Sequence, residues 1–175
     1  MALHKTAIAI LLIVLAVAER VWFDLGPNVE LVTLMSLLAA IWLSRKAAVV
    51  VALGSLIASD LLIGNSNIFL FTWSGFTVIG WAAWFIARFS SFKRILAAGA
   101  FGLTSAVWFY LWTNFGVWLI GNLYPATFSG LIQSYYMGLP FLKLQAVSNL
   151  LILPGALTAL SLAANLKKEF LTIKA

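Results

Sequence analysis

The sequence predicts an all-α integral membrane protein that crosses the bilayer with six helices. Of its 175 residues, 63% are hydrophobic and only 9% are charged, and the mean hydropathy is +1.05. Soluble domains carry about 25% charged residues, so this composition excludes a soluble fold. Six apolar stretches reach or approach the about 20 residues that a helix needs to cross the hydrocarbon layer. The whole chain, residues 1–175, is therefore expected to form a single membrane domain.

The expected spans follow one another with short connections. The second is short and the last two are long, and tilting, kinks or re-entrant pieces would absorb the mismatch with the bilayer. Pro154 predicts a kink in the last span, because proline removes a helical hydrogen bond. The six spans are expected at residues 6–22, 29–43, 47–63, 68–87, 95–120 and 140–166.

The first span also resembles a secretory signal peptide. It has a basic start, and Ala16-Val17-Ala18 has the form of a cleavage site. Cleavage would leave five spans in the same orientation. The apolar stretch resumes through residues 21–23, however, and this favours a first span that is retained.

Charged residues alternate between the two ends of the expected spans. Lys and Arg near span ends are retained in the cytoplasm, so the basic loops indicate the cytoplasmic side. The sequence therefore predicts a multi-pass membrane protein with both termini in the cytoplasm. Anionic headgroups suffice to explain the net charge of +6, and no nucleic-acid partner is expected. The basic groups are His4-Lys5, Arg45-Lys46, Arg88 with Lys93-Arg94, and Lys167-Lys168 with Lys174; the outer acids are Glu19, Asp24, Glu30 and Asp60, joined there by Arg20 and Lys143.

The last outer connection, residues 121–138, is long enough to hold a short amphipathic helix. Its apolar residues recur at helical spacing after Pro125. Such a helix would lie in the membrane interface or cap the bundle, and Tyr124, Pro125 and Phe128 would belong to this lid. The residues at helical spacing are Phe128, Leu131, Ile132, Tyr135 and Tyr136.

Polar residues from four spans are expected at one level near the outer end of the bundle. An ionisable side chain inside a membrane costs about 2.5–3.5 kcal/mol, so Asp60 is a functional candidate by default. Gln145 and Asn149 share a helix face because they are four residues apart. The expected substrate-binding residues are Asp60, Trp73, Asn114, Trp118, Tyr135, Tyr136, Gln145 and Asn149, with Arg20 and Lys143 as charge partners.

Each of these residues also has a purely structural interpretation. Asp60 could be an interfacial carboxylate that pairs with Arg20 or Lys143, and Glu19 with Arg20 could mark the water boundary. Asn114 could join helices through a hydrogen bond, typically about 0.6 kcal/mol in a membrane. The functional interpretation depends on the clustering of polar residues and not on any one of them.

Few residues could support enzymatic chemistry. The chain has a single histidine, His4, and no cysteine, which excludes intramembrane zinc and haem sites and a Ser-His dyad. An intramembrane aspartyl protease needs two facing carboxylates, and only Asp60 lies within an expected span. We therefore expect no enzyme activity, no metal and no cofactor.

Several motifs support a family resemblance. The chain resembles a family of uncharacterised small bacterial six-helix membrane proteins that is similar to the S components of energy-coupling factor (ECF) vitamin transporters. The motifs are Gly26-Pro27-Asn28, Ser59-Asp60-Leu61-Leu62-Ile63-Gly64, Thr113-Asn114-Phe115-Gly116-Val117-Trp118, Tyr124-Pro125-Ala126-Thr127, Tyr135-Tyr136 and Leu139-Pro140-Phe141.

The resemblance implies a six-helix S-component-like bundle with cytoplasmic termini and a pocket at the outer face. It also implies a vitamin-like ligand and, as partner, an ATP-driven energy-coupling module. S components usually dock on that module through alanines spaced four apart in the first helix. Ala7, Ala9, Ala16 and Ala18 do not keep this spacing, which places docking in doubt.

The leading hypothesis is a membrane protein that binds a small metabolite from the outer side and takes part in its uptake, the metabolite being a vitamin or cofactor precursor. One acid among amides would suit a neutral or cationic ligand better than a polyanion. The alternative is a structural or assembly subunit of a membrane complex with no small-molecule ligand. A third reading is an enzyme that acts on lipid through Asp60.

Overall fold

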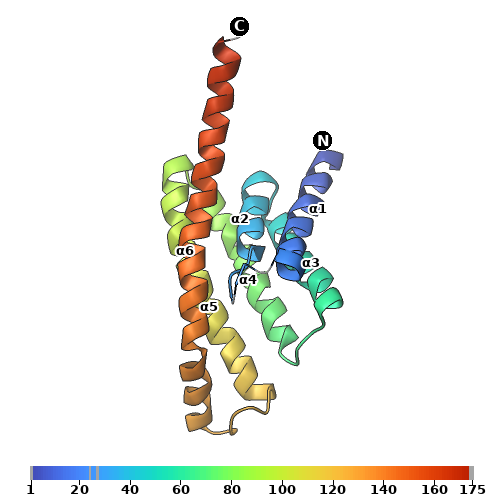
Figure 1. Cartoon of the computed structure of the whole chain (residues 1–175), viewed down its shortest axis with the longest axis vertical. Coiled ribbons are helices and arrows are strands. Elements are labelled where there is room, and N and C mark those ends of the chain that lie inside the picture. Colours follow the sequence, from blue (N-terminus) through green and yellow to red (C-terminus); the bar gives the residue numbers. More distant parts are fainter. Residues whose placement is uncertain (1, 24, 27, 174–175) are drawn as a thin grey trace.

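The computed structural model describes residues 2–23, 25–26 and 28–173, and these form helices and connections without a strand. Among the described residues, five helices are long and apolar enough to cross a membrane, which agrees with an all-α membrane protein but is one fewer than the six spans expected. Figure 1 shows the helices as one elongated bundle with both chain ends at the same end of the molecule. The elements are α1 (Ala2–Ala18), the π-helical turn η1 (Glu19–Phe23), α2 (Val32–Trp42), α3 (Arg45–Ile63), α4 (Phe69–Ala87), α5 (Ser91–Ile120) and α6 (Phe128–Ile173).

The second expected span, residues 29–43, is the short helix α2 of 11 residues. At 1.5 Å per residue it is about 16 Å long, roughly half the thickness of the hydrocarbon layer. The connection before it turns at Gly26 and Asn28, whose φ angles are +126° and +57°. The second span was expected to be short, and the helix is shorter still, so α2 has the apolar composition of a span without the length.

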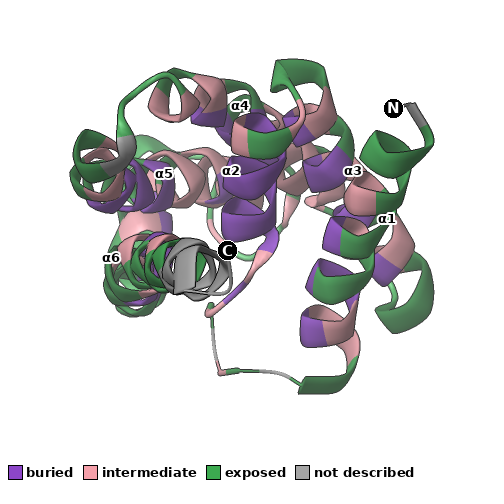
Figure 2. Ribbon diagram, turned by 90° about the horizontal axis from the view of Figure 1, so that it is seen from above, coloured by how far each residue is buried: buried purple, intermediate pink, exposed green. Residues whose placement is uncertain are grey.

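Helix α2 forms the centre of the bundle. All nine residues from Val32 to Ala40 are buried. It contacts α1, α3, α4 and α6, and Figure 2 shows it as the buried helix among the others. A helix that is buried on every side must be apolar all round, which explains why its sequence has no amphipathic pattern.

Small residues bring the long helices together. A Cβ on Gly80 in α4 would lie 3.0 Å from the carbonyl oxygen of Ala48 in α3. A Cβ on Gly102 in α5 would lie 2.9 Å from the carbonyl oxygen of Asn149 in α6. Close backbone approach at small residues is the main way in which helices pack inside a membrane.

The expected amphipathic helix and the expected sixth span form one continuous helix, α6, with Pro140 and Pro154 inside it. The Tyr110 hydroxyl donates to the carbonyl of Tyr135, and the Ser134 hydroxyl donates to that of Asn114, so α5 holds the first turns of α6 in line. The prediction of a separate amphipathic helix was therefore wrong.

The orientation of these first turns of α6 also differs from the expectation. Phe128 and Tyr136 are 77% and 68% exposed, whereas Gly130, Ser134 and Gly138 are buried against the rest of the protein. In a bilayer the solvent itself is apolar, so large apolar side chains face outward and small residues face the neighbouring helix. The helical period of residues 128–136 is therefore confirmed, whereas the expectation that their large apolar side chains cover the bundle is wrong for Phe128 and Tyr136.

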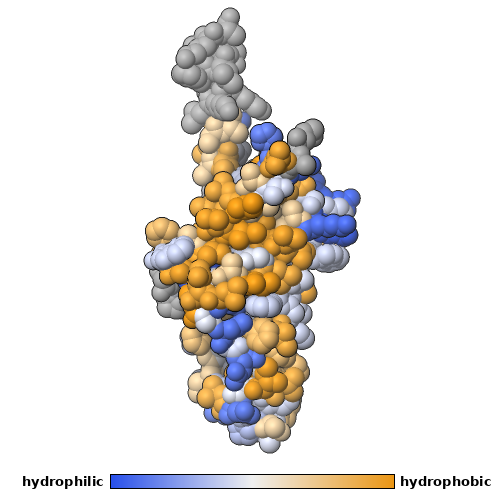
Figure 3. Space-filling view, turned by 90° about the vertical axis from the view of Figure 1, so that its right-hand side faces the viewer, coloured by the Kyte–Doolittle hydropathy of each residue, from blue (hydrophilic) through white to orange (hydrophobic). Residues whose placement is uncertain are grey.

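The surface agrees with a membrane-embedded bundle. Figure 3 shows a broad hydrophobic band on one face of the molecule, with hydrophilic side chains gathered toward its two ends. At the end of the bundle where the chain termini lie, two basic side chains approach the Trp84 ring. The guanidinium of Arg88 lies 4.8 Å from the centre of this ring, and that of Arg45 lies 5.2 Å from it. Such cation–π contacts hold basic groups beside aromatic rings at a membrane interface.

Candidate functional site

A cavity of about 310 Å³ with polar and apolar lining residues lies beside the N-terminal end of α2. Its lining comes from η1, the connection to α2, and helices α3, α4, α5 and α6. It is partly open to the surroundings. The lining residues are Glu19, Arg20, Gly26, Asn28, Val29, Glu30, Ile63, Thr72, Phe76, Phe109 and Gln145.

Two buried carboxylates meet the N-terminal end of α2. Glu30 is 7% exposed and accepts hydrogen bonds from the backbone N–H and the hydroxyl of Thr33, at 2.9 and 2.5 Å. Glu19 is 3% exposed and accepts from the N–H of Leu31 at 3.1 Å. The first N–H groups of a helix have no partner within it and favour negative charge. These carboxylates therefore cap the N-terminal end of α2 and allow the helix to begin inside the bundle.

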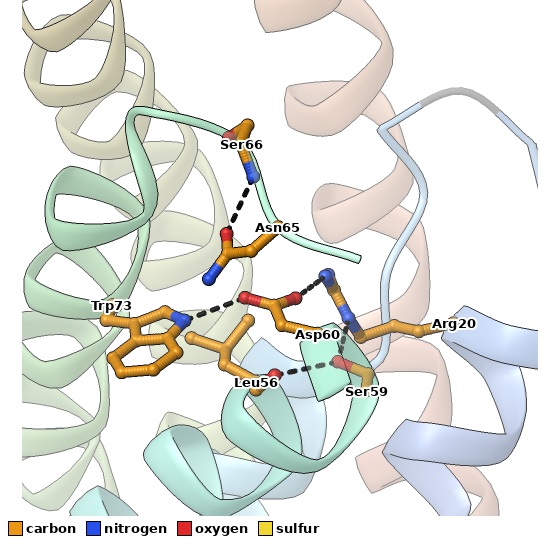
Figure 4. Close-up of polar contacts among 7 residues, drawn as sticks. All are labelled: Arg20, Leu56, Ser59, Asp60, Asn65, Ser66 and Trp73. Atoms are coloured by element: carbon orange, nitrogen blue, oxygen red, sulfur yellow. Dashed lines mark hydrogen bonds and ion pairs between the residues drawn. The ribbon is translucent and has the colours of Figure 1, made fainter. Parts of the chain in front are cut away.

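The π-helical turn η1 places Arg20 between the cavity and α3. Its Nε donates to Ser59 Oγ at 2.8 Å, and its NH2 group lies 3.2 Å from Asp60 Oδ1. The indole N–H of Trp73 donates to the other oxygen of Asp60 at 2.8 Å, as Figure 4 shows. Both carboxylate oxygens of Asp60 therefore have a partner. Of the two charge partners expected from the sequence, Arg20 is the one that pairs with Asp60. Turns of this π type are frequent at functional sites.

Gln145 is the expected site residue on α6 that lines the cavity. It is only 4% exposed. Asn149, one turn further along α6, is fully buried. Its amide nitrogen donates weakly to the carbonyl of Gly102 at 3.4 Å, and its Oδ1 has no hydrogen-bond partner. Asn149 does not line the cavity.

Three other expected site residues lie on α5 and α6 beyond the cavity. The Asn114 amide donates to the carbonyl of Tyr110 within α5 at 2.8 Å. The Tyr135 hydroxyl donates from α6 to the carbonyl of Leu111 in α5 at 3.3 Å. The Trp118 indole donates to the carbonyl of Pro125 at 3.1 Å and thereby fixes the connection between the two helices. These contacts are structural, and none of the three residues lines the cavity.

The remaining expected residues lie on the outer surface. Tyr136 and Lys143 line a shallow hollow on the flank of α6 and are exposed. Tyr124 is partly buried, and Phe128 is exposed at the start of α6. The polar cluster expected from the sequence is therefore divided between the cavity, the α5–α6 contact and the surface of α6.

Sequence reasoning did not include several lining residues in the expected site. Glu30 was noted only as an outer charge, although an acid directly before an apolar stretch is a signal for a buried helix start. Phe76 and Phe109 lie in the middle of apolar spans, where nothing in a single sequence separates a cavity wall from ordinary packing. Their rings face each other, with centres 4.6 Å apart.

Comparison with known proteins gives one match. A family model described as "Family of unknown function (DUF6580)" matches residues 2–171. No curated protein and no solved structure matches the chain. Within the residues that the structure describes, no group of three or more His, Cys, Asp or Glu side chains could hold a metal ion.

Proposed function

Since the chain belongs to the DUF6580 family of unknown function, we propose from its cavity that it is an integral membrane substrate-binding protein for the uptake of a small metabolite. The ligand enters from the outer side of the bacterial cytoplasmic membrane and is held beside the N-terminal end of α2. The termini lie in the cytoplasm in this orientation, because the basic loops share their side of the bundle.

The position of Gln145 in the cavity wall carries the proposal. Small-molecule sites are mostly apolar and hold a few polar groups that fix the orientation of the ligand. The Gln145 amide can donate a hydrogen bond to such a ligand and accept one from it. A cavity of about 310 Å³ is at the lower end of the about 300–1,000 Å³ found for small-molecule sites.

The class of metabolite follows from the resemblance to S components, which favours a vitamin or cofactor precursor. The lining offers apolar rings and a few polar groups, as small-molecule sites usually do. The same proposal includes uptake without an ATP-driven module, because the alanines of α1 lack the four-residue spacing through which S components usually dock on it.

Native mass spectrometry of the protein extracted gently from its host membrane tests the proposal. We expect a vitamin-sized molecule to remain bound to the wild type and to be lost from Gln145→Leu. The empty variant should remain folded, because leucine is close to glutamine in size. Gln133→Leu, at an exposed position of the same helix, is the matched control and should retain the ligand.

The assembly-subunit alternative makes the opposite forecast in this experiment. It requires a bare protein with a stoichiometric protein partner and no difference between the two glutamine variants. That result would overturn the proposed function.

A further inference from the structure

We infer that the ligand of this cavity is an organic cation, meaning an ammonium group or a positively charged heteroaromatic ring that carries an apolar part. The inference rests on the proposed function and names the chemical class of its substrate. Three features of the wall support it, namely its charges, the hydrogen bonds of α2 and its aromatic rings.

The described lining residues carry more negative than positive groups. Glu19 and Glu30 supply two carboxylates, and Arg20 is the one basic side chain among them. The guanidinium of Arg20 is already bonded to Asp60 and Ser59. The described lining therefore presents more acidic than basic side chains to a ligand, which favours a cationic group over an anionic one.

The hydrogen bonds at the start of α2 exclude an anionic ligand. A free helix N-terminus is a ready site for a phosphate or carboxylate. Here the N–H groups of Leu31 and Thr33 already donate to Glu19 and Glu30. The protein's own carboxylates thus occupy the position that an anion would take, and they would repel it.

The remaining wall suits an organic cation better than an inorganic one. Phe76 and Phe109 line the same cavity and form a ring pair. Aromatic faces attract ammonium and guanidinium groups, and they also stack on flat ligands. The Gln145 amide oxygen can accept an N–H of such a ligand.

The test compares three probes that share a ring and differ in charge: benzylammonium, benzyl alcohol and benzoate. Each is titrated against the purified full-length protein while its thermal stability is followed. We expect benzylammonium alone to raise Tm with increasing concentration. A ligand that binds the folded state stabilises it by mass action, so the shifts yield an apparent affinity.

Two variants of opposite effect sharpen the result. Glu30→Gln keeps the shape of the side chain and an acceptor for Thr33 but loses the charge. This variant should bind benzylammonium at least about tenfold more weakly than the wild type. Gln145→Glu adds a carboxylate to the wall and should bind benzylammonium more tightly. Gln133→Lys makes the same change of net charge as Glu30→Gln at an exposed position and should leave binding unaltered.

The outcomes separate this inference from the proposed function. If benzoate or benzyl alcohol stabilises best, or if the molecule released from the native protein is neutral or anionic, the cation class is wrong and the binding function stands. If no probe stabilises and no molecule is released, both are wrong. A released cation with the expected order of variants supports both.

Discussion

Arg20 lies between the cavity and α3, and its guanidinium binds Ser59 and Asp60 while the Trp73 indole holds Asp60 from the other side. The side chains of Arg20 and Asp60 are 20% and 9% exposed, so the pair is only partly screened by solvent. Removing one member leaves the other charge uncompensated near the bilayer. This network fixes the position of η1, and through it the position of Glu19.

We therefore predict that Asp60→Asn destabilises the empty protein by about 2 kcal/mol, below the about 3–5 kcal/mol of a fully buried pair. The new amide can still accept a hydrogen bond from Trp73, so the loss of stability comes mainly from the removal of the negative charge. The change in the free energy of unfolding is measured by thermal or denaturant unfolding in detergent.

A double-mutant cycle with Arg20→Gln is the control for this prediction. The double variant should recover part of the lost stability, since neither charge is then left alone. Strictly additive effects of the two substitutions would show that the ion pair contributes nothing.

Among the helices, α2 and α6 show how tertiary packing changes the meaning of a pattern. The composition of α2 predicted a span, and it is instead a buried half-length helix whose first turn is held by Glu30 and Glu19. The periodicity of residues 128–136 predicted a lid, and it is instead the beginning of α6, packed along α5.

The contact between α5 and α6 predicts a difference between two glycines of one helix. Gly102→Ala should destabilise the protein by about 1–3 kcal/mol, because the new methyl group would meet the carbonyl of Asn149, a backbone atom that cannot easily move. Gly99→Ala would place its methyl group 3.5 Å from the flexible Leu150 side chain, and is expected to be neutral or stabilising. Thermal unfolding of both variants gives the comparison; equal effects would contradict the close approach at Gly102.

For the molecule as a whole, the distribution of charge and the path of the chain agree. The chain ends and the connections at residues 43–44 and 88–90 lie at one end of the bundle, and those at residues 64–68 and 121–127 lie at the other. Arg45, Arg88 and Lys93 belong to the first end, while Asp60 and the cavity lie toward the second. This separation is the basis for the proposed orientation in the membrane.

The orientation can be measured directly, because the natural chain has no cysteine. Ser66→Cys and Ser90→Cys place single thiols at exposed positions in opposite connections of α4. We predict that a membrane-impermeant maleimide labels the first in intact cells and the second only after the cells are opened. Labelling of both from the same side would contradict the topology, and the reverse pattern would invert the orientation.

Local properties of the sequence determined the class of this protein. Hydropathy and length identify the five long helices, and the alternation of charge indicates their direction, because these quantities depend on each segment and on the bilayer alone. The tertiary structure decided the short, central position of α2 and the membership of the cavity. Glu19, Phe76, Phe109 and Gln145 come together from distant parts of the chain. Which side of a helix faces a cavity, a neighbour or lipid depends on close packing among helices, and a single sequence does not encode that direction in any local pattern.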